Sequence, residues 1–304
     1  MTPRMRSIDN IKEVFAYASE AVADVARREL GHTPGARVFD LSFPSPAGGR
    51  VTAYLVLPQA GRPPPVIVFH HWGFGSRSSF LSEARAYAEI GVASLLVDAP
   101  HMGSRGRGLP PVQLSEVAIN YLKTAVTDVR RALDVLDQSR EVDGARTVYV
   151  GHSLGGAFVG HLAAVEPRFR GLAAMAGPPR ISRTWSPRPN PKYRDTVEPY
   201  DGENFIGFAE RPILLQFGKS DRFVPEREAQ RLVRAAPEGA TVHWYDAGHA
   251  LNAEALTDRS DWLLGVLGHQ ARPTPHRLRR VSLPRRERVA AVVGEHVYAA
   301  LLTD

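Results

Sequence analysis

Short apolar runs alternate with helix-like segments along most of this chain, and no other feature restricts its fold as strongly. The strand-like runs are 65–70, 92–98, 147–151, 172–177, 212–218 and 241–247, and the helix-like segments are 78–90, 112–138, 153–165, 225–236 and 249–267. Strands that alternate with helices pair in parallel, and the helices cover both faces of the sheet. The alternation therefore predicts an α/β fold built on a mostly parallel, doubly wound sheet.

The first sixty residues follow a different pattern. Residues 7–30 repeat apolar side chains at helical spacing, and Gly31 follows in the position of a helix C-cap, so this segment is predicted to be helical. The runs 36–43 and 50–57 are strand-like and flank the turn sequence "PSPAGG". They predict an antiparallel hairpin ahead of the parallel strands.

The predicted domain boundaries lie where the alternation of strand-like and helix-like segments stops. We expect an N-terminal helical segment (1–35), an α/β domain (36–270), and a tail (271–304) made of a basic linker and an amphipathic helix. Within the domain, residues 177–209 are rich in proline, arginine and tyrosine without a clear period, and we interpret them as a short cap-like insertion. The amphipathic helix is expected to pack on the domain or on another copy of the chain, which would make a homo-oligomer.

Composition and charge exclude several classes of function. The net charge is +6, and residues 271–288 hold seven arginines and one glutamate, so the rest of the chain carries no net charge. We therefore expect a solvated basic tail and no nucleic-acid partner. The absence of cysteine excludes disulfides and thiolate metal sites. No apolar run reaches the roughly 18 residues of a membrane span, and the N-terminus does not read as a signal peptide, so we expect a soluble, cytoplasmic protein.

The sequence "GHSLGG" at 151–156 stands at a predicted strand-to-helix junction. In the pattern Gly-x-Ser-x-Gly the serine takes a strained backbone conformation, and its small neighbours Gly151 and Gly155 let the strand and the helix approach closely. The helix N-terminus behind the serine favours developing negative charge. An ordinary tight turn would share this pattern, but the partners described next favour Ser153 as a catalytic nucleophile.

A serine hydroxyl is a poor nucleophile without a base. His249 directly follows the strand-like run 241–247, at the predicted start of a helix, and is the candidate base. His243 lies inside that strand and is expected to be structural. His152 lies within the serine turn and is expected to point away from the base position.

The base in turn needs an acid that holds its tautomer and stabilises the imidazolium. Asp221 stands just past the strand-like run 212–218 and is the candidate acid. Asp246 is a rival, but it is only three residues from His249 on the same loop, whereas an aspartate at the end of the preceding strand has better reach. The resulting chain order of serine, aspartate and histidine is the one found for such triads on α/β sheets.

Two backbone amides are predicted to stabilise the oxyanion that forms when a carbonyl is attacked. One belongs to Leu154, next to the nucleophile, and the other to Trp72, in the loop 69–76 after the first parallel strand. The neighbouring His70 and His71 point to opposite sides of an extended chain, and no other ligand cluster accompanies them. We therefore expect neither a metal site nor a cofactor.

Four residues are candidates for contact with the substrate, namely His71, His101, Arg105 and Trp185. His101 and Arg105 lie in the loop "DAPHMGSRGRG" after a strand, where they either contact a polar or anionic substrate or only shape the loop. Trp185 belongs to the cap-like insertion, whose aromatic side chains either wall an apolar acyl pocket or are buried to keep the insertion ordered.

Five motifs together resemble the α/β-hydrolase superfamily, and most of all its dienelactone-hydrolase-like and small serine esterase branch. They are "VIVFHHWGFGS", "LLVDAPHMGSRG", "YVGHSLGG", "ILLQFGKSDRFVP" and "DAGHALNAEA". The resemblance implies acyl transfer in two steps, in which Ser153 attacks a carbonyl with His249 as general base and water then hydrolyses the acyl-enzyme. The chain departs from many relatives by having His70-His71 in place of His-Gly, and it lacks the cysteine nucleophile typical of dienelactone hydrolases.

The expected function is thus hydrolysis of a small or medium carboxylic ester by a serine hydrolase. A thioesterase or an acylaminopeptidase-like enzyme would use the same triad and oxyanion hole, so both alternatives stay open. A non-catalytic binding protein on the same fold is a third hypothesis. Such proteins usually lack a member of the triad, and all three candidates are present here.

Overall fold

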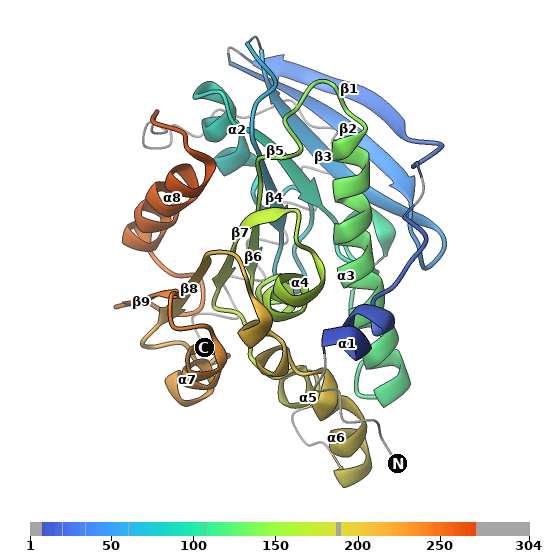
Figure 1. Ribbon diagram of the computed structural model, residues 1–304, viewed down its shortest axis with the longest axis vertical. Helices are drawn as coiled ribbons and strands as arrows, with labels where there is room; N and C mark the ends of the chain where they lie inside the picture. The colour runs from blue at the N-terminus through green and yellow to red at the C-terminus, as the bar shows by residue number, and fades with distance from the viewer. Residues whose placement is uncertain are drawn as a thin grey trace.

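One mixed sheet organises the protein in a computed structural model that describes residues 8–19, 21–33, 35–59, 61–106, 108–186 and 190–271 (Figure 1). The strands are β1 (Ala26–Thr33), β2 (Ala36–Pro44), β3 (Arg50–Pro58), β4 (Val66–His70), β5 (Ala93–Val97), β6 (Thr147–His152), β7 (Phe169–Met175), β8 (Ile213–Gly218) and β9 (Thr241–Tyr245). Within the described residues their order is β1-β2-β3-β5-β4-β6-β7-β8-β9. Pairing is antiparallel from β1 to β5 and parallel from β5 to β9 in this order. The predicted architecture is confirmed.

The strand order reverses at β4, because β5 lies on one side of it and β6 on the other. In open α/β sheets, ligands bind outside the carboxyl ends of the strands at such a switch point. The loop that begins at His71 follows β4, and Ser153 follows β6. The topology therefore brings two predicted parts of the site to the same place.

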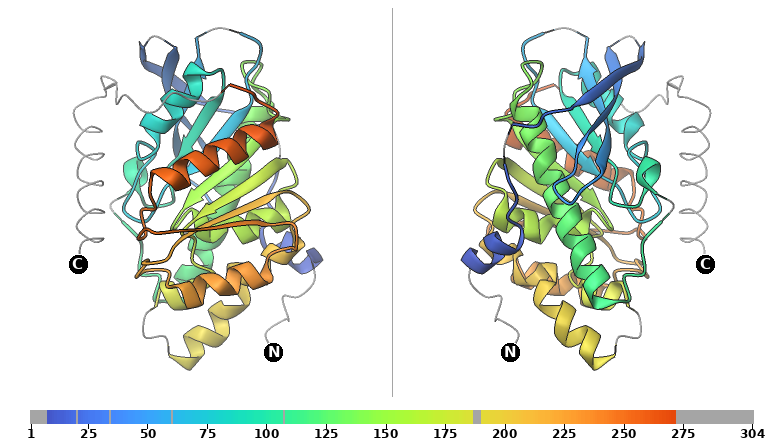
Figure 2. Two further views of the ribbon diagram at one scale, coloured as in Figure 1. Left: turned by 90° about the vertical axis from the view of Figure 1, so that its left-hand side faces the viewer. Right: turned by 90° about the vertical axis from the view of Figure 1, so that its right-hand side faces the viewer.

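Helices cover both faces of the sheet. They are α1 (Ile8–Val14), α2 (Leu81–Glu89), α3 (Ser115–Asp137), α4 (Val159–Val165), α5 (Ile181–Thr184), α6 (Pro191–Val197), α7 (Glu226–Ala235) and α8 (Ala253–Leu267), with short 3₁₀ helices η1 (Gly103–Arg105), η2 (Gly156–Phe158), η3 (Glu198–Tyr200), η4 (Gly202–Asn204) and η5 (Ile206–Phe208). The left view of Figure 2 shows α8 across one face, and the right view shows α3 on the other.

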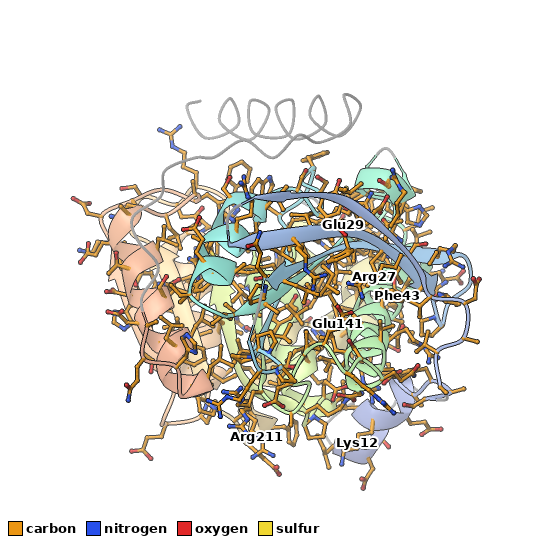
Figure 3. The ribbon with its side chains drawn as sticks, turned by 90° about the horizontal axis from the view of Figure 1, so that it is seen from above. Lys12, Arg27, Glu29, Phe43, Glu141 and Arg211 are labelled. Carbon is orange, nitrogen blue, oxygen red and sulfur yellow. The ribbon has the colours of Figure 1, made fainter. Side chains whose placement is uncertain are left out.

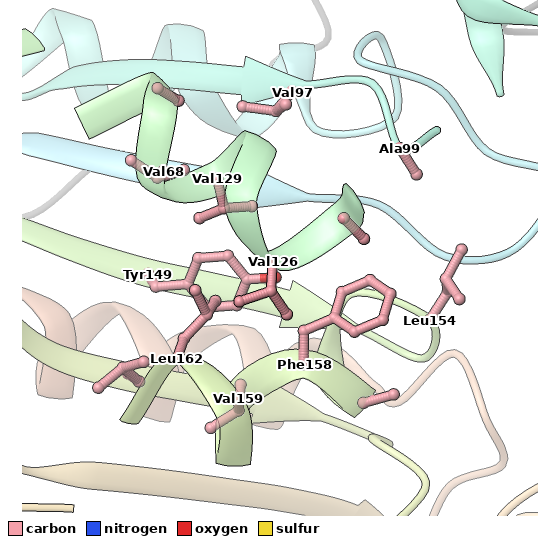
Figure 4. Packing of buried hydrophobic residues seen from close by; sticks show 14 of the residues in the cluster. Val68, Val97, Ala99, Val126, Val129, Tyr149, Leu154, Phe158, Val159 and Leu162 are labelled. Carbon is pink, nitrogen blue, oxygen red and sulfur yellow. The ribbon is translucent and has the colours of Figure 1, made fainter. Parts of the chain in front are cut away.

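An apolar core lies on each face of the sheet because side chains alternate along every strand. In β4, Val66 and Val68 join the core that contains side chains of α3 and α4, whereas Ile67 and Phe69 join the core beneath α2 and α8. Figure 4 shows Val68 beside Val129 of α3. Burial of each such side chain contributes about 1.5–3 kcal/mol, so β4 is held firmly from both sides.

The N-terminal segment differs from its prediction. Helix α1 ends at Val14, the described residues after it are irregular up to β1, and β1 forms the edge of the sheet. Gly31 is therefore not a helix cap but lies in a strand, beside an irregularity in the pairing of β1 with β2. Gly35, at φ +95°, turns the chain between these strands. The predicted helix is wrong over residues 15–19 and 21–30 because the backbone of β1 pairs with an otherwise open strand edge.

Contacts with distant residues hold this segment in place. Arg27 of β1 forms an ion pair with Glu141, which follows α3 (Figure 3). The Arg27 guanidinium lies 3.8 Å from the centre of the Phe39 ring. The Tyr17 hydroxyl donates a hydrogen bond to the carboxylate of Asp134, 117 positions away, at 2.9 Å. None of these partners is visible in the local sequence pattern that predicted a helix.

The predicted cap-like insertion contains α5, α6 and the 3₁₀ helices η3 to η5. Its aromatic side chains Trp185, Tyr193 and Phe205 are buried. The Phe205 ring lies 4.7 Å from that of His161 in α4, so it attaches the insertion to the domain. Residues 272–304 of the predicted tail lie outside the described residues. Within the described residues, no helix is both long enough and apolar enough to cross a lipid bilayer.

Candidate active site

Ser153 lies on a sharp turn between β6 and η2, with a positive φ of 52°. Its amide donates a hydrogen bond of 2.8 Å to the carbonyl of Met175 in β7, which holds the turn against the sheet. Glycine is required on both sides of the serine. A Cβ on Gly151 would collide with the backbone of Gly155, and a Cβ on Gly155 would collide with the carbonyl of His70. The local sequence thus produces the strained elbow that the motif predicts.

A chain of hydrogen bonds connects the three residues that the sequence proposed as a triad. His249 Nε2 lies 2.7 Å from Ser153 Oγ, and His249 Nδ1 lies 2.7 Å from Asp221 Oδ2. The side chains of His249 and Asp221 are buried. When Nδ1–H donates to the carboxylate, Nε2 is left as an acceptor for the serine hydroxyl, which is the arrangement that general-base catalysis requires.

Backbone donors fix the orientation of the acid. Asp221 Oδ1 accepts hydrogen bonds from the amides of Phe223 at 2.8 Å and Val224 at 2.9 Å, which leaves Oδ2 directed at His249. Asp246, the rival acid, is exposed. The geometry therefore favours Asp221 as the partner of the base.

His249 lies in the loop after β9 and not at a helix start as predicted. The helix α8 begins only at Ala253, and the side chain of Asn252 caps it by accepting a hydrogen bond from the amide of Ala255. The sequence places a helix-like pattern directly after His249, but the capping asparagine sets the boundary four residues later. The candidate base is therefore carried by an irregular loop, whose position depends on tertiary contacts.

The predicted oxyanion amides lie on two loops that are hydrogen-bonded to each other. The amide of Gly155 donates to the carbonyl of His71 at 3.1 Å, which ties the serine turn to the loop that carries Trp72. Among the described residues, no hydrogen bond is found for the Leu154 amide. The Trp72 carbonyl accepts hydrogen bonds from His71 Nδ1 at 2.6 Å and from the Gly75 amide at 3.0 Å.

His71 supports this loop from within the domain. Its Nδ1 donates to the Trp72 carbonyl, and its Nε2 accepts a hydrogen bond of 3.0 Å from the amide of Ala99. The side chain is buried, and burial lowers the pKa of His71, so the ring is neutral as this pattern requires. Because both ring nitrogens bond to the backbone, the structure gives no support to a polar contact of His71 with the substrate, and the expected contact stays a prediction.

His70 supports the serine turn from within the domain. Its Nδ1 lies 3.0 Å from the hydroxyl of Tyr149, which in turn donates to the carbonyl of Gly155 at 2.9 Å. Burial lowers the pKa of His70 well below its ordinary value. No cluster of potential metal ligands is found among the described residues.

The guanidinium of Arg105 is bound within the domain. Its Nη1 donates hydrogen bonds of 2.7 Å to Asp128 in α3 and 3.1 Å to the carbonyl of Asp98. The side chains of Arg105 and Asp128 are only 9% and 2% exposed. Arg105 therefore fastens the loop after β5 to α3, which favours the alternative that it shapes the loop over a contact with the substrate.

His101 and Trp185 remain candidates for substrate contact. His101 is exposed and has a positive φ of 60°. Its ring stacks on Tyr121 of α3 at 6.3 Å between ring centres, and the edge of Tyr121 meets Trp185 at 5.4 Å. The structure thus connects the loop after β5 with the cap-like insertion through one aromatic side chain.

Sequence reasoning missed the role of Asp98 within the same loop. Asp98 is fully buried, and its carboxylate accepts hydrogen bonds from the Arg77 amide at 2.7 Å and from the Thr52 hydroxyl at 2.6 Å. Gly103, at φ +54°, packs so closely on this carboxylate that a Cβ would collide with it. A strand-end aspartate followed by a glycine was the available signal, but it does not reveal these partners.

Two further neighbours of the triad also escaped prediction. His152 does not point away from the base but donates from Nε2 to the carbonyl of His249 at 2.8 Å. Phe223 is 49% exposed, and its ring centre lies 5.0 Å from that of His249. Their positions next to Ser153 and Asp221 in sequence were the only available hints.

Comparison with known proteins connects this geometry to a family. A family model described as acetyl xylan esterase matches residues 13–179, which include the oxyanion loop and the serine turn. Esterase YjfP of Escherichia coli is 29% identical over 227 residues, covering 65% of this chain and 87% of that protein. An uncharacterized protein of Mycobacterium tuberculosis is 30% identical over 182 residues, covering 57% of this chain, and the chain spans only 58% of that protein's length.

Solved structures agree in fold. The acetyl xylan esterase of Paenibacillus sp. R4 superposes with a TM-score of 0.72 at 19% identity, covering 87% of this chain and 95% of that one. Acetyl xylan esterase 1 of Thermoanaerobacterium sp. JW/SL YS485 gives 0.73 at 17% identity, covering 85% and 94%. At these identities the likeness establishes the α/β-hydrolase fold and leaves the chemistry to the site itself.

Proposed function

The chain belongs to the acetyl xylan esterase family, and we propose on that premise that it is a serine esterase that cleaves carboxylic esters through an acyl-enzyme. The observation that carries the proposal is the continuous hydrogen-bond chain from Ser153 through His249 to Asp221. Because the family description and the two solved neighbours above name acetyl xylan, acetyl esters are the first acyl class to test.

The first half-reaction forms the acyl-enzyme. Ser153 Oγ attacks the ester carbonyl while its proton passes to His249 Nε2, and the ionised Asp221 stabilises the resulting imidazolium. The tetrahedral oxyanion is stabilised by the amides of Leu154 and Trp72. The carbon–oxygen bond to the alcohol then breaks, and His249 returns the proton to the leaving oxygen.

The second half-reaction releases the acid. Water enters where the alcohol left, loses a proton to His249 Nε2 and attacks the acyl carbonyl. Collapse of the second tetrahedral intermediate frees the carboxylic acid and restores the Ser153 hydroxyl. The same groups therefore serve both steps, and the alcohol is absent from the second.

Phe223 is our candidate for a contact with the alcohol. His249 must approach the leaving oxygen to protonate it, so a half-exposed ring 5.0 Å from the imidazole borders the side from which the alcohol departs. His101 and Trp185 are the remaining candidates for contact with other parts of the substrate.

A fluorophosphonate probe combined with ester turnover tests the proposal. Wild-type protein should be labelled and the Ser153→Ala variant should not, and p-nitrophenyl acetate, butyrate and octanoate should reveal the acyl preference. Matched thioester and anilide substrates decide between an esterase and the thioesterase or peptidase alternatives. Absence of both labelling and turnover would reject the serine-esterase proposal.

A further inference from the structure

We propose that His152 is a positioning residue that joins the loop of the catalytic base to the oxyanion loop. This inference rests on the proposed function, because it assigns a new role within the same site. It concerns the residue directly before Ser153, whose side chain belongs to neither the hydrogen-bond chain of the triad nor the predicted oxyanion donors.

The first contact of His152 is with the loop that carries the base. His152 Nε2 lies 2.8 Å from the backbone carbonyl oxygen of His249, 97 positions away in sequence. A carbonyl only accepts hydrogen bonds, so Nε2 must carry the proton. The side chain is 3% exposed, and burial, reinforced by the neighbouring His249, lowers the pKa of His152 to about 3. His152 therefore stays neutral and keeps this donor at any pH at which an esterase would work.

The second contact is with the loop that carries the oxyanion donor. The His152 ring meets the Trp72 ring edge to face at 5.5 Å between centres, and it lies 5.4 Å from the ring of His249. One buried side chain on β6 thus contacts residues of both neighbouring loops. Because it is adjacent to Ser153, its position is fixed by the serine turn itself.

These contacts matter because the base loop has no regular structure of its own. The segment between β9 and α8 contains His249, whose Nε2 must stay within hydrogen-bond distance of Ser153 Oγ. A bond to the carbonyl of His249 restrains the backbone from which the imidazole projects. A displacement of about 1 Å in such a group can cost roughly 100-fold in rate. A neutral ring also adds no positive charge beside the imidazolium that forms during catalysis.

Two substitutions separate the hydrogen bond from the packing. His152→Gln can place an amide N–H near the position of Nε2 but removes the ring, whereas His152→Phe keeps a ring and removes the donor. The matched control is His161→Phe in α4, because the buried His161 also lies with Nε2 2.8 Å from a backbone carbonyl, that of Tyr200 in the cap-like insertion.

The measurements are kcat and KM for p-nitrophenyl acetate, with the melting temperature of each variant. We expect His152→Phe to lower kcat by about 10- to 100-fold with KM changed less than about twofold, and His152→Gln to recover most of kcat. His161→Phe should lower the melting temperature and leave kcat near the wild-type value. A His152→Phe variant with wild-type kcat, or an equal loss of kcat in His161→Phe, would overturn the proposal.

A measurement without substrate distinguishes this inference from the proposed function. Nitrogen NMR of the histidine rings reports the hydrogen bonding of His249 whether or not the protein hydrolyses esters. We expect the His249 resonances to move in His152→Phe and to stay in place in His161→Phe. If wild-type protein is inactive on every ester but these shifts appear, the proposed function fails and the positioning role stands. If His249 is unchanged in His152→Phe, the positioning role fails.

Discussion

The loop after β5 and the loop after β8 each carry a buried aspartate at the carboxyl edge of the sheet, yet the two aspartates differ in where their hydrogen bonds end. Asp98, after β5, accepts from the Arg77 amide and the Thr52 hydroxyl, which belong to the scaffold. Asp221, after β8, accepts hydrogen bonds from two backbone amides on one carboxylate oxygen and from His249 on the other. A further hydrogen bond connects His249 to the hydroxyl of Ser153.

This difference explains why position at a strand end does not by itself identify a functional residue. Every described hydrogen bond of the Asp98 carboxylate joins it to a residue that supports the fold. Arg105 likewise pairs with Asp128. Around Asp221 the hydrogen bonds lead to Ser153, the proposed nucleophile, on a strained turn. Substitutions in the loop after β5 should therefore lower the free energy of unfolding, and substitutions around Asp221 should lower catalytic activity.

Substitution of the proposed nucleophile should give the largest effect on activity. Ser153→Ala should lower kcat by roughly 10⁵- to 10⁶-fold, because it removes the nucleophile while leaving the elbow intact. The melting temperature should stay near the wild-type value. Measured kcat for p-nitrophenyl acetate checks this, and residual labelling of the variant by a fluorophosphonate would show that another residue is the nucleophile.

Substitution of the acid should give the next largest effect. Asp221→Asn should lower kcat by about 10³- to 10⁴-fold, because an amide N–H in place of Oδ2 would favour the tautomer in which Nε2 carries the proton and cannot accept one from Ser153. The control is Asp246→Asn, which changes the exposed rival on the base loop and should retain wild-type kcat. If the two variants lose activity equally, the assignment of the acid is wrong.

Breaking the ion pair in the other loop should cost stability. Arg105→Met leaves Asp128 buried without its cation, and the free energy of unfolding in urea should fall by about 3 kcal/mol. The activity of the protein that remains folded should change less than threefold, about 0.6 kcal/mol. The double variant with Asp128→Asn should recover much of the stability. A large rise in KM without loss of stability would instead show that Arg105 binds substrate.

The stability lost in Arg105→Met should depend on pH. Burial raises the pKa of Asp128, while its pairing with Arg105 opposes the rise. Because the folded-state pKa is above the unfolded value, stability is fully present below the unfolded pKa and falls as the pH rises through the folded one. Removal of the cation raises the folded pKa further, so Arg105→Met should lose less stability at pH 5 than at pH 8.

Urea unfolding at both pH values, with the Arg105→Met/Asp128→Asn variant as control, measures this difference. The change is limited to about 1.4 kcal/mol for each pH unit inside the window. A loss of equal size at pH 5 and pH 8 would mean that the charge on Asp128 is not its cause.

The smallest expected effect concerns the rim of the site. Phe223→Ala should lower kcat/KM for phenyl acetate by about 3- to 10-fold, because it removes an apolar contact worth about 1 kcal/mol, and it should leave methyl acetate nearly unchanged. Hydrolysis of the common acetyl-enzyme should keep its rate, since the alcohol has already left. An equal loss for both esters would contradict a contact with the alcohol.

Much of the fold and part of the site follow from local sequence patterns. Alternating apolar runs predicted β4 to β9 and the helices α2, α3, α4, α7 and α8, and the glycines around Ser153 predicted the elbow. The three triad candidates lie in hydrogen-bond distance, although their catalytic roles stay a prediction. The sequence offered His71 and Arg105 as candidates for substrate contact and left loop shaping open for Arg105; in the structure His71 bonds to the backbone and Arg105 pairs with Asp128.

What the sequence by itself determined is local, because strand periodicity and a glycine-flanked turn depend only on neighbouring residues. What the tertiary structure decided is the choice of partners across the sheet. It placed residues 26–33 at the sheet edge instead of in a helix, paired Arg105 with Asp128, and brought His152 against the carbonyl of His249. Each of these depends on which strands lie side by side, and a polar side chain reveals its role only when its buried partner is known.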